Sequence, residues 1–274
     1  MPPEVHAFWL PKAGNTAEEY EDAFAFELES SRIALSDGAT ESSFADLWAR
    51  SLSRAFAAGN ADEQNLDRWL EPLQAGWHAS VPWSRLPWFA EEKARNGAFA
   101  TLLGLDLLPA PPVVGPAPLP RPPSLWERLW RRKKETPPPP PLPPTPRWRA
   151  IAVGDSCLFQ IRNDALVYSF PHERSDQFNS RPLLLSSNPS WNHTVRQGVK
   201  NAESIRTGQD WFLLATDALS HWFLKQYELR RKPWNQLLEL RSQQDFQRFV
   251  EDARKEGVMK NDDTTLIVVR SPES

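Results

Sequence analysis

Short apolar runs that begin or end at carboxylates recur along most of this chain of 274 residues. The runs are strand-like, because aliphatic, aromatic and β-branched residues follow one another between turn residues. The four junctions lie at 21–26, 33–38, 211–217 and 262–269. Acids this far apart in sequence share one site only if their strands lie side by side, and clustered carboxylates repel unless a cation holds them together. The pattern therefore predicts a divalent-metal site built on strand ends.

Two segments after the first of these strands have the spacing of helices. The apolar positions of the first segment are Phe44, Leu47, Trp48, Leu52 and Phe56. They recur at intervals of three and four residues, so a helix with one buried face is predicted, ending near Gly59. A second helix is predicted over 62–73, with Pro72 in its last turn. Three tryptophans are interpreted as packing residues of the proline-interrupted loop that follows: Trp77, Trp83 and Trp88.

The pattern of the second half predicts short strands at 157–161 and 165–169, and then one late helix in one or two pieces. The apolar residues of that helix are Leu237, Leu240, Phe246, Phe249 and Val250. Strands, two helices, more strands and then a final helix and strand imply an α+β domain, in which helices cover antiparallel sheet.

A proline-rich segment at 109–146 interrupts this pattern and holds 16 of the 27 prolines. Proline lacks the amide proton and fixes its own φ, so the segment forms neither sheet nor continuous helix. The flanks at 99–107 and 148–153 are strand-like, which predicts a hairpin whose turn is replaced by a long surface insert. We therefore interpret 1–274 as a single domain. The rival interpretation, a linker between two domains, is disfavoured because the acids lie on both sides.

Residues 124–134 within the insert predict a short amphipathic helix. Ser124 and Glu127 have the spacing of a capping box, and 131–134 are all basic. Two interpretations stay open. The helix folds back onto its own domain, or the insert docks onto an acidic partner, an anionic membrane surface or a partner domain that binds proline-rich segments.

Composition narrows the function classes. The formal net charge of −3 gives no basic field for nucleic acid. The one cysteine, Cys157, excludes an internal disulfide framework and fits a reducing compartment. The first residues lack the basic and apolar regions of a signal peptide, and no apolar stretch approaches the roughly 20 residues of a membrane-spanning helix. We expect a soluble, cytoplasmic protein.

The chemistry of the acids points to Mg²⁺ or Mn²⁺, because carboxylate oxygens are hard donors. Two such ions that share a carboxylate activate a water and orient a phosphoryl group. Gly38 leaves its own carbonyl accessible to a metal, because no side chain crowds the backbone there. Taken alone, Asp37 before this glycine would be interpreted as a turn residue. The prediction depends on several acids together.

Five short motifs in order resemble those of the metal-dependent serine/threonine protein phosphatases of type 2C. They are Glu21–Asp22, Ala34–Gly38, Val153–Ser156, Leu214–Leu219 and Asp262–Val269. The resemblance covers nearly the whole chain apart from the insert. It implies a β-sandwich of two antiparallel sheets flanked by helices, with two Mn²⁺ or Mg²⁺ ions at the sheet ends. It also implies hydrolysis of phosphoserine and phosphothreonine on protein substrates by a metal-activated water.

The resemblance also implies roles for the first motifs. Asp37 would bridge the two metals, and the carbonyl of Gly38 would bind one of them. Glu21 would ligate the second metal, while Asp22 would hold its coordinated waters.

For the first metal the resemblance implies Asp217 and Asp262, with Asp263 as the alternative to Asp262 one residue away. Asp155 matches a position that helps bind a third, weaker metal in some members. The family usually has an aspartate where this chain has His221, which changes the metal preference of that third site or is simply structural.

The chain departs from the family pattern in three places. Residues 14–20 contain no arginine to bind phosphate, and Lys12 is the nearest cation. Residues 39–41 lack the histidine that would act as general acid, and Ala218 replaces a usual glycine. The leading interpretation is an enzyme, a metal-dependent phosphoprotein phosphatase. The alternative is a catalytically weak or inactive phosphatase-like module that recruits a partner through the insert, and a hydrolase for small phosphate esters also stays open.

Overall fold

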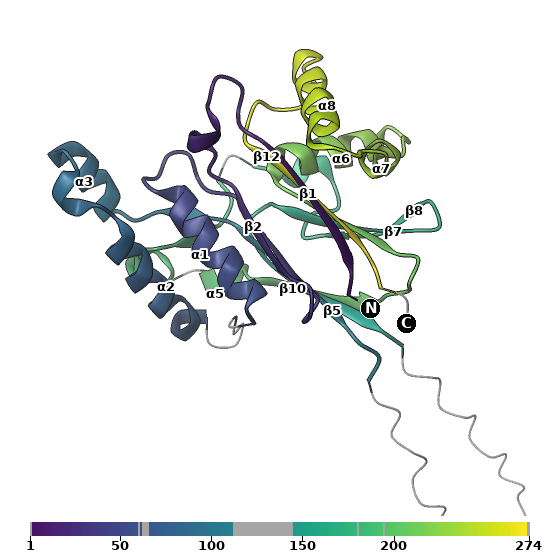
Figure 1. Cartoon of the computed structure of the whole chain (residues 1–274), viewed down its shortest axis with the longest axis horizontal. Helices are drawn as coiled ribbons and strands as arrows, with labels where there is room; N and C mark the ends of the chain where they lie inside the picture. The colour runs from purple at the N-terminus through teal and green to yellow at the C-terminus, as the bar shows by residue number, and fades with distance from the viewer. Residues whose placement is uncertain are drawn as a thin grey trace, which may run out of the picture.

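Two antiparallel sheets of five strands each pack face to face in the described part of the computed structural model (Figure 1). The structure describes residues 2–59, 61, 66–111, 145–179, 181–193 and 195–272. The strands of the first sheet are β1 Glu4–Leu10, β12 Thr264–Arg270, β11 Trp211–Ala215, β7 Cys157–Arg162 and β8 Ala165–Phe170, in spatial order. Those of the second sheet are β10 Lys200–Ile205, β6 Arg147–Val153, β5 Leu102–Leu108, β3 Arg32–Ser36 and β2 Ala23–Glu27. A short pair adds β4 Phe99–Ala100 and β9 Leu185–Ser186.

Helices cover the outer face of each sheet, so that the predicted α+β sandwich is confirmed. The helices on the side of the second sheet are α1 Ala45–Ala57, α2 Leu66–Ser80, α3 Trp88–Arg95 and α5 Val195–Gly198. Those on the side of the first sheet are α6 Asp217–Glu228, α7 Pro233–Leu238 and α8 Gln243–Lys255. Single 3₁₀ turns lie at Ala17–Glu19, Trp83–Arg85, Ser175–Gln177 and Pro189–Trp191. No helix of the described segments is long and apolar enough to cross a membrane.

Apolar side chains fill three layers, one between the sheets and one beneath each set of helices. Trp148 of β6 joins the two sheets across the middle layer. Its indole is fully buried and donates a hydrogen bond of 3.0 Å to Oε1 of Gln160 on β7. The same ring meets Phe212 of β11 edge to face, with centroids 5.9 Å apart. The sheets are therefore fixed relative to each other, which in turn fixes the spacing of the strand ends.

Several predicted elements are confirmed with small shifts in their ends. The first predicted helix is α1, and its five predicted apolar residues pack against the second sheet. The two short strands after Asp155 are β7 and β8. The late helix is in two pieces, α7 and α8, with Leu240 in the connection between them.

The prediction for the second helix is wrong at its C-terminal end. The helix α2 does not stop at Leu73 but continues through Pro72 to Ser80. Pro72 is on the exposed face of the helix, where the carbonyl that proline leaves without a partner is open to solvent, and the apolar spacing continues to the buried Trp77. Trp77 and Trp88 therefore belong to helices rather than to a loop. The predicted start at 62–65 lies outside the described residues.

The hairpin that the flanks of the insert predict is present. Strands β5 and β6 pair antiparallel, from Leu102 opposite Val153 to Leu108 opposite Arg147. The strand predicted at 99–107 is broken at Thr101, which turns toward the carboxylates described below. Most of the insert, including the short helix predicted at 124–134, lies outside the described residues, and the single-domain interpretation stays a prediction.

Gly104 allows α1 to pack closely on β5, because a Cβ atom there would lie 2.3 Å from the ring of the buried Phe56. We expect Gly104→Ala to lower the free energy of unfolding by about 1–3 kcal/mol, the usual cost of overpacking a core. Gly76 lies inside α2 with no atom within 4 Å of an added Cβ. Gly76→Ala should therefore raise stability by roughly 0.5–1 kcal/mol. Urea denaturation measures the free energy of unfolding of both variants. The close packing at Gly104 would be contradicted if both substitutions changed this free energy equally.

Candidate metal centre

The strand register brings five of the predicted acids to one end of the sandwich. The pairing between neighbouring strands ends at four residue pairs on this side: Ala23 with Ser36, Leu102 with Val153, Ala215 with Cys157, and Ala215 with Leu266. The acids that lie just beyond these ends are Asp22, Asp37, Asp155, Asp217 and Asp262. This end is opposite to the one where the first and last strands begin and finish, marked N and C in Figure 1.

Asp37 lies at the centre of this carboxylate cluster, the five aspartates just named. Thr101 fixes its backbone from both sides, since Asp37 N donates to Thr101 Oγ1 at 2.9 Å and Thr101 N donates to the Asp37 carbonyl at 2.8 Å. Burial raises the pKa of Asp37 well above its usual range. The negative charges of the other four members of the cluster raise it further.

Asp22 has one satisfied and one orphaned carboxylate oxygen. Its Oδ2 accepts a hydrogen bond of 2.6 Å from the hydroxyl of Thr265, which also lies 2.5 Å from the hydroxyl of Tyr20. Its Oδ1 is buried and has no hydrogen-bond partner among the described residues. Burial raises the pKa of Asp22 strongly and the charges of Asp263 and Asp217 add to the shift, while the hydroxyl groups of Thr265 and Thr216 work in the opposite direction. An orphaned buried oxygen of this kind is rare in native proteins and indicates a missing cation or water.

Gly38 and Glu21 meet through their backbones. A Cβ atom on Gly38 would lie 2.6 Å from the carbonyl oxygen of Glu21, so only glycine fits there. The Glu21 carboxylate is half-buried, which raises its pKa, while a hydrogen bond with Thr40 works in the opposite direction. Its charged neighbours include Lys93, so this side chain lies on the α1 and α3 side of the cluster.

Asp217 and Asp262 form the other side of the cluster. Asp217 is the first residue of α6, and its Oδ1 accepts a bond of 2.6 Å from the amide of Ala218. The ammonium of Lys260 lies 3.2 Å from Asp217 Oδ2 and 2.6 Å from Asp262 Oδ2. Burial opposes the charge on Lys260, but the two carboxylates raise its pKa above the usual value, so the side chain stays protonated.

Asp263 has a different role from Asp262. Its two oxygens accept hydrogen bonds of 2.7 Å from the amides of Lys12 and Glu21, and its side chain is buried. It therefore ties the N-terminal segment to the start of β12. Asp262, in contrast, is a charged neighbour of both Asp37 and Asp217. Of the two adjacent acids, the geometry favours Asp262 as a ligand.

Asp155 and His221, the residues predicted for a third metal site, lie in different surroundings. Asp155 is buried in the turn between β6 and β7, and burial, followed by the charge of Asp217, raises its pKa to about 7. His221 lies one helical turn beyond Asp217, and its ring packs edge to face on Phe178 with centroids 5.6 Å apart. This contact gives His221 a packing role.

A buried aspartate elsewhere in the sandwich shows how different the cluster is. Asp210 is fully buried, but Arg162, Gln160 and Thr207 all donate to its oxygens. Burial alone would raise the pKa of Asp210, and these donors hold it below its usual value. Asp22, Asp37 and Asp155 have no comparable set of donors among the described residues, and the pKa values of these three aspartates shift upward instead.

The donor chemistry of the cluster fits a hard divalent cation. No group of three or more His, Cys, Asp or Glu side chains in the described segments is drawn closely enough together to hold an ion as it stands. The orphaned oxygen of Asp22 and the mutual repulsion around Asp37 are nevertheless relieved by a divalent ion, and all the ligand atoms are oxygens, as Mg²⁺ and Mn²⁺ prefer.

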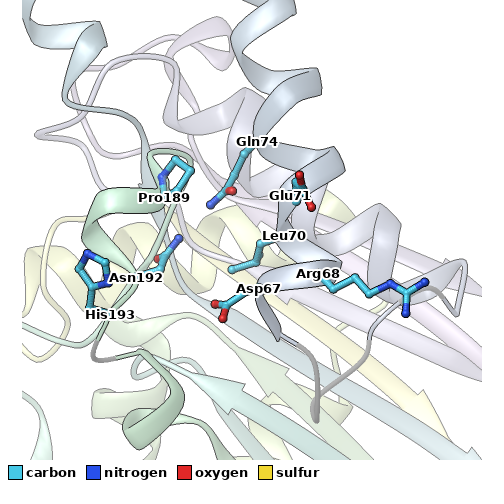
Figure 2. A pocket seen from close by; sticks show the side chains of 8 residues that line it. All are labelled: Asp67, Arg68, Leu70, Glu71, Gln74, Pro189, Asn192 and His193. Carbon is cyan, nitrogen blue, oxygen red and sulfur yellow. The ribbon is translucent and has the colours of Figure 1, made fainter.

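A cavity lined by none of the cluster aspartates lies beside α2. It has a volume of about 710 Å³ and is lined by residues of α2 and of the 189–193 segment. Figure 2 shows Gln74 and Asn192 facing one another across it, with the Arg68 side chain directed away. The amides of Gln74 and Asn192 bind the backbone of Ser186, so both hold β9 in place. None of the predicted site residues lines this cavity.

Solved structures match the chain over its whole length. The Mycobacterium tuberculosis serine/threonine phosphatase PstP/Ppp is 16% identical, with 100% of each chain covered and a TM-score of 0.58. The fold is that of the type 2C phosphatases. The photosystem II phosphatase PBCP matches 99% of this chain and 100% of its own, with 13% identity and a TM-score of 0.55. The catalytic domain of PstP in complex with two manganese ions covers 99% of both chains, with 14% identity and a TM-score of 0.55.

No family model matches the chain, and no curated protein matches its sequence. Identities of 13–16% show a shared fold and no more. The architecture that the motif resemblance implied is thus confirmed, and activity has to be argued from the site itself.

Sequence reasoning missed three side chains that shape the cluster: Lys260, Tyr20 and Thr265. Each stands next to or within two residues of a predicted acid, which is the one signal available in the sequence. Thr265 was interpreted only as a strand residue. Its hydroxyl group, together with that of Tyr20, holds Asp22.

The pKa of Asp155 predicts a pH-dependent effect on the stability of the metal-free protein. The folded state keeps a proton on this group up to about pH 7, whereas the unfolded chain releases it near the ordinary value of 3.8. Stability is therefore lost as the pH rises between these values. In the presence of a chelator, Asp155→Asn should melt close to the wild type at about pH 4 and increasingly above it as the pH rises to about 7, by a few degrees or more.

Asp164→Asn is the matched control, because Asp164 is exposed and Lys232 lowers its pKa. This variant should not gain stability over the wild type as the pH rises. Thermal melts followed by circular dichroism measure both differences. An Asp155→Asn variant that loses stability relative to the wild type at the higher pH would contradict the prediction.

Proposed function

We propose that this protein is a metal-dependent phosphatase that hydrolyses phosphoserine and phosphothreonine on protein substrates. The observation that carries the proposal is the position of Asp37, whose buried carboxylate faces four other aspartates at one end of the sandwich. An arrangement that gathers mutually repelling carboxylates has no structural benefit by itself and is relieved by divalent cations. The shared fold of solved phosphatases supports the proposal.

The proposed ligand set has Asp37 between two ions. Asp217 and Asp262 would hold the first ion, and Glu21 with the carbonyl of Gly38 would hold the second. When bound, the ions polarise the phosphoryl group and lower the pKa of a water so that it can act as the nucleophile.

The chain's own groups orient the reactants. Thr265 holds one oxygen of Asp22, which leaves the other oxygen to accept a hydrogen bond from a water. Thr101 fixes the backbone of Asp37 from both sides, so its carboxylate keeps its place when charge is redistributed. Asp155 remains the candidate for a third, weaker ion. The contact of His221 with Phe178 argues against including the histidine.

The second candidate is a catalytically weak or inactive phosphatase-like module that binds a phosphoprotein or another partner, with the proline-rich insert at 109–146 as the recruiting segment. Two observations favour it. The described segment 14–20 has no arginine that could bind a phosphate group. The nearest cation in sequence, Lys12, lines a cavity of about 450 Å³ beside α8 that none of the cluster aspartates lines. Lys260 also lies between Asp217 and Asp262, where the first ion would bind.

Turnover with added Mn²⁺ distinguishes the two candidates. We expect hydrolysis of an aryl phosphate and of a phosphothreonine peptide, and a loss of about a thousandfold in Asp37→Asn, since a metal ion supplies several kcal/mol to the reaction. Asp164→Asn changes an exposed acid of the same type and should keep full activity. Metal binding without any turnover would support the binding module instead.

The two adjacent acids before β12 give a further prediction. Asp262→Ala should weaken Mn²⁺ binding by about tenfold or more and leave the melting temperature of the metal-free protein close to that of the wild type. Asp263→Ala removes the acceptor of two half-buried backbone amides and should lower the melting temperature by several degrees. Calorimetric titration and thermal melts measure the two properties. The reverse pattern would assign the ligand role to Asp263.

A further inference from the structure

Lys260 occupies a position inside the carboxylate cluster that nothing in the motif pattern anticipates. Its ammonium contacts Asp262 at 2.6 Å and Asp217 at 3.2 Å, so one cation bridges the two proposed ligands of the first ion. The side chains of these aspartates are only 22% and 24% exposed. The Lys260 side chain itself is 61% exposed, so the contact lies at the rim of the cluster, where solvent screens it in part.

The backbone on both sides of Lys260 is anchored, so this contact is not that of a freely moving surface lysine. Met259, the residue before it, is buried in the apolar layer beneath α8. Asn261, the residue after it, accepts a hydrogen bond of 2.8 Å from the amide of Ala13 and donates one to the carbonyl of the same residue. The ammonium is thus tethered to the site by a chain held at both ends.

We infer that Lys260 is a built-in counter-ion that neutralises Asp217 and Asp262 in the metal-free protein and competes with the divalent ion for them. The inference rests on the proposed function, because it assigns the first metal position to these two residues. A divalent ion and the ammonium need the same carboxylate oxygens and repel each other, so binding of one displaces the other. A tethered group competes at an effective concentration set by its tether, in the millimolar range for a short one.

This competition lowers the apparent affinity of the first site for a metal ion. The ammonium lies against both carboxylates, so the oxygens that would receive an ion are already paired with a cation. The ion must first break two charge-assisted contacts, which lowers its affinity. The protein would therefore fill its first site only at higher metal concentrations than the same cluster without the lysine.

The test measures Mn²⁺ affinity without turnover, by calorimetry and by the electron paramagnetic resonance signal of free Mn²⁺. We expect Lys260→Met to bind Mn²⁺ about tenfold more tightly than the wild type, which corresponds to ~1.4 kcal/mol. Lys260→Arg keeps the charge and should stay near the wild type. Lys255→Met is the matched control, because Lys255 is a similarly exposed lysine whose ammonium contacts the exposed Asp252 at 3.3 Å.

Thermal melts separate this role from a purely structural one. In the presence of a chelator, Lys260→Met should melt below the wild type, because the two aspartates lose their counter-ion. With saturating Mn²⁺ the order should reverse. A structural lysine would lower the melting temperature under both conditions, and Lys260→Gln provides the same comparison if the methionine variant does not fold.

The outcomes distinguish the inference from the function on which it rests. Equal or weaker Mn²⁺ binding by Lys260→Met, while the wild type binds the ion, overturns the role of Lys260 and leaves the metal-dependent function standing. If neither protein binds Mn²⁺, both the inference and the proposed metal centre are wrong. Tighter binding in Lys260→Met but not in Lys260→Arg or Lys255→Met supports the competition.

Discussion

Repulsion among buried carboxylates is the constraint on which the rest of this structure depends. Five aspartates meet at one end of the sandwich, and burial together with mutual repulsion raises the pKa of Asp37 and of its neighbours. Such a cluster holds together only if the scaffold is rigid, because free side chains would separate. Trp148, which joins the two sheets, and Thr101, which fixes Asp37 from both sides, supply that rigidity. At the opposite end, Asp210 is also buried, but its hydrogen-bond donors hold its pKa below the usual value.

The sequence predicts this fold well where local periodicity decides the structure. Strand runs that end at acids remain recognisable because each strand end needs a turn residue, so the carboxylates and their strands could be found together. The end of α2 could not, because the exposure of Pro72 depends on which face of the helix packs. Two adjacent acids look alike in a sequence. Only the paths of the Lys12 and Glu21 backbones show that Asp263 is a structural acceptor.

Shared fold and shared chemistry separate clearly in this protein. The sandwich matches solved phosphatases over its whole length, although fewer than one residue in five is the same. What the fold carries over is geometry, namely the convergence of strand ends. Substrate handling depends on loops such as 14–20, and loops vary far more readily than a sheet. The carboxylates at the strand ends can therefore be present without the loop groups that would bind a phosphate. For this reason the site supports metal binding more directly than it supports catalysis.

Lys260 bears on both candidate functions. If the lysine permanently replaced a metal ion, the cluster would no longer bind one, and the inactive module would be favoured. The remaining imbalance argues against that view. Even with its ammonium in place, Asp22 Oδ1 stays buried without a hydrogen-bond partner in the part of the chain that the structure describes, and the pKa of Asp37 stays well above its usual range. A single monovalent cation at one side of the cluster cannot satisfy carboxylates that meet at its centre. The cluster therefore still carries uncompensated negative charge. This imbalance favours a protein that binds divalent ions over one that no longer binds them.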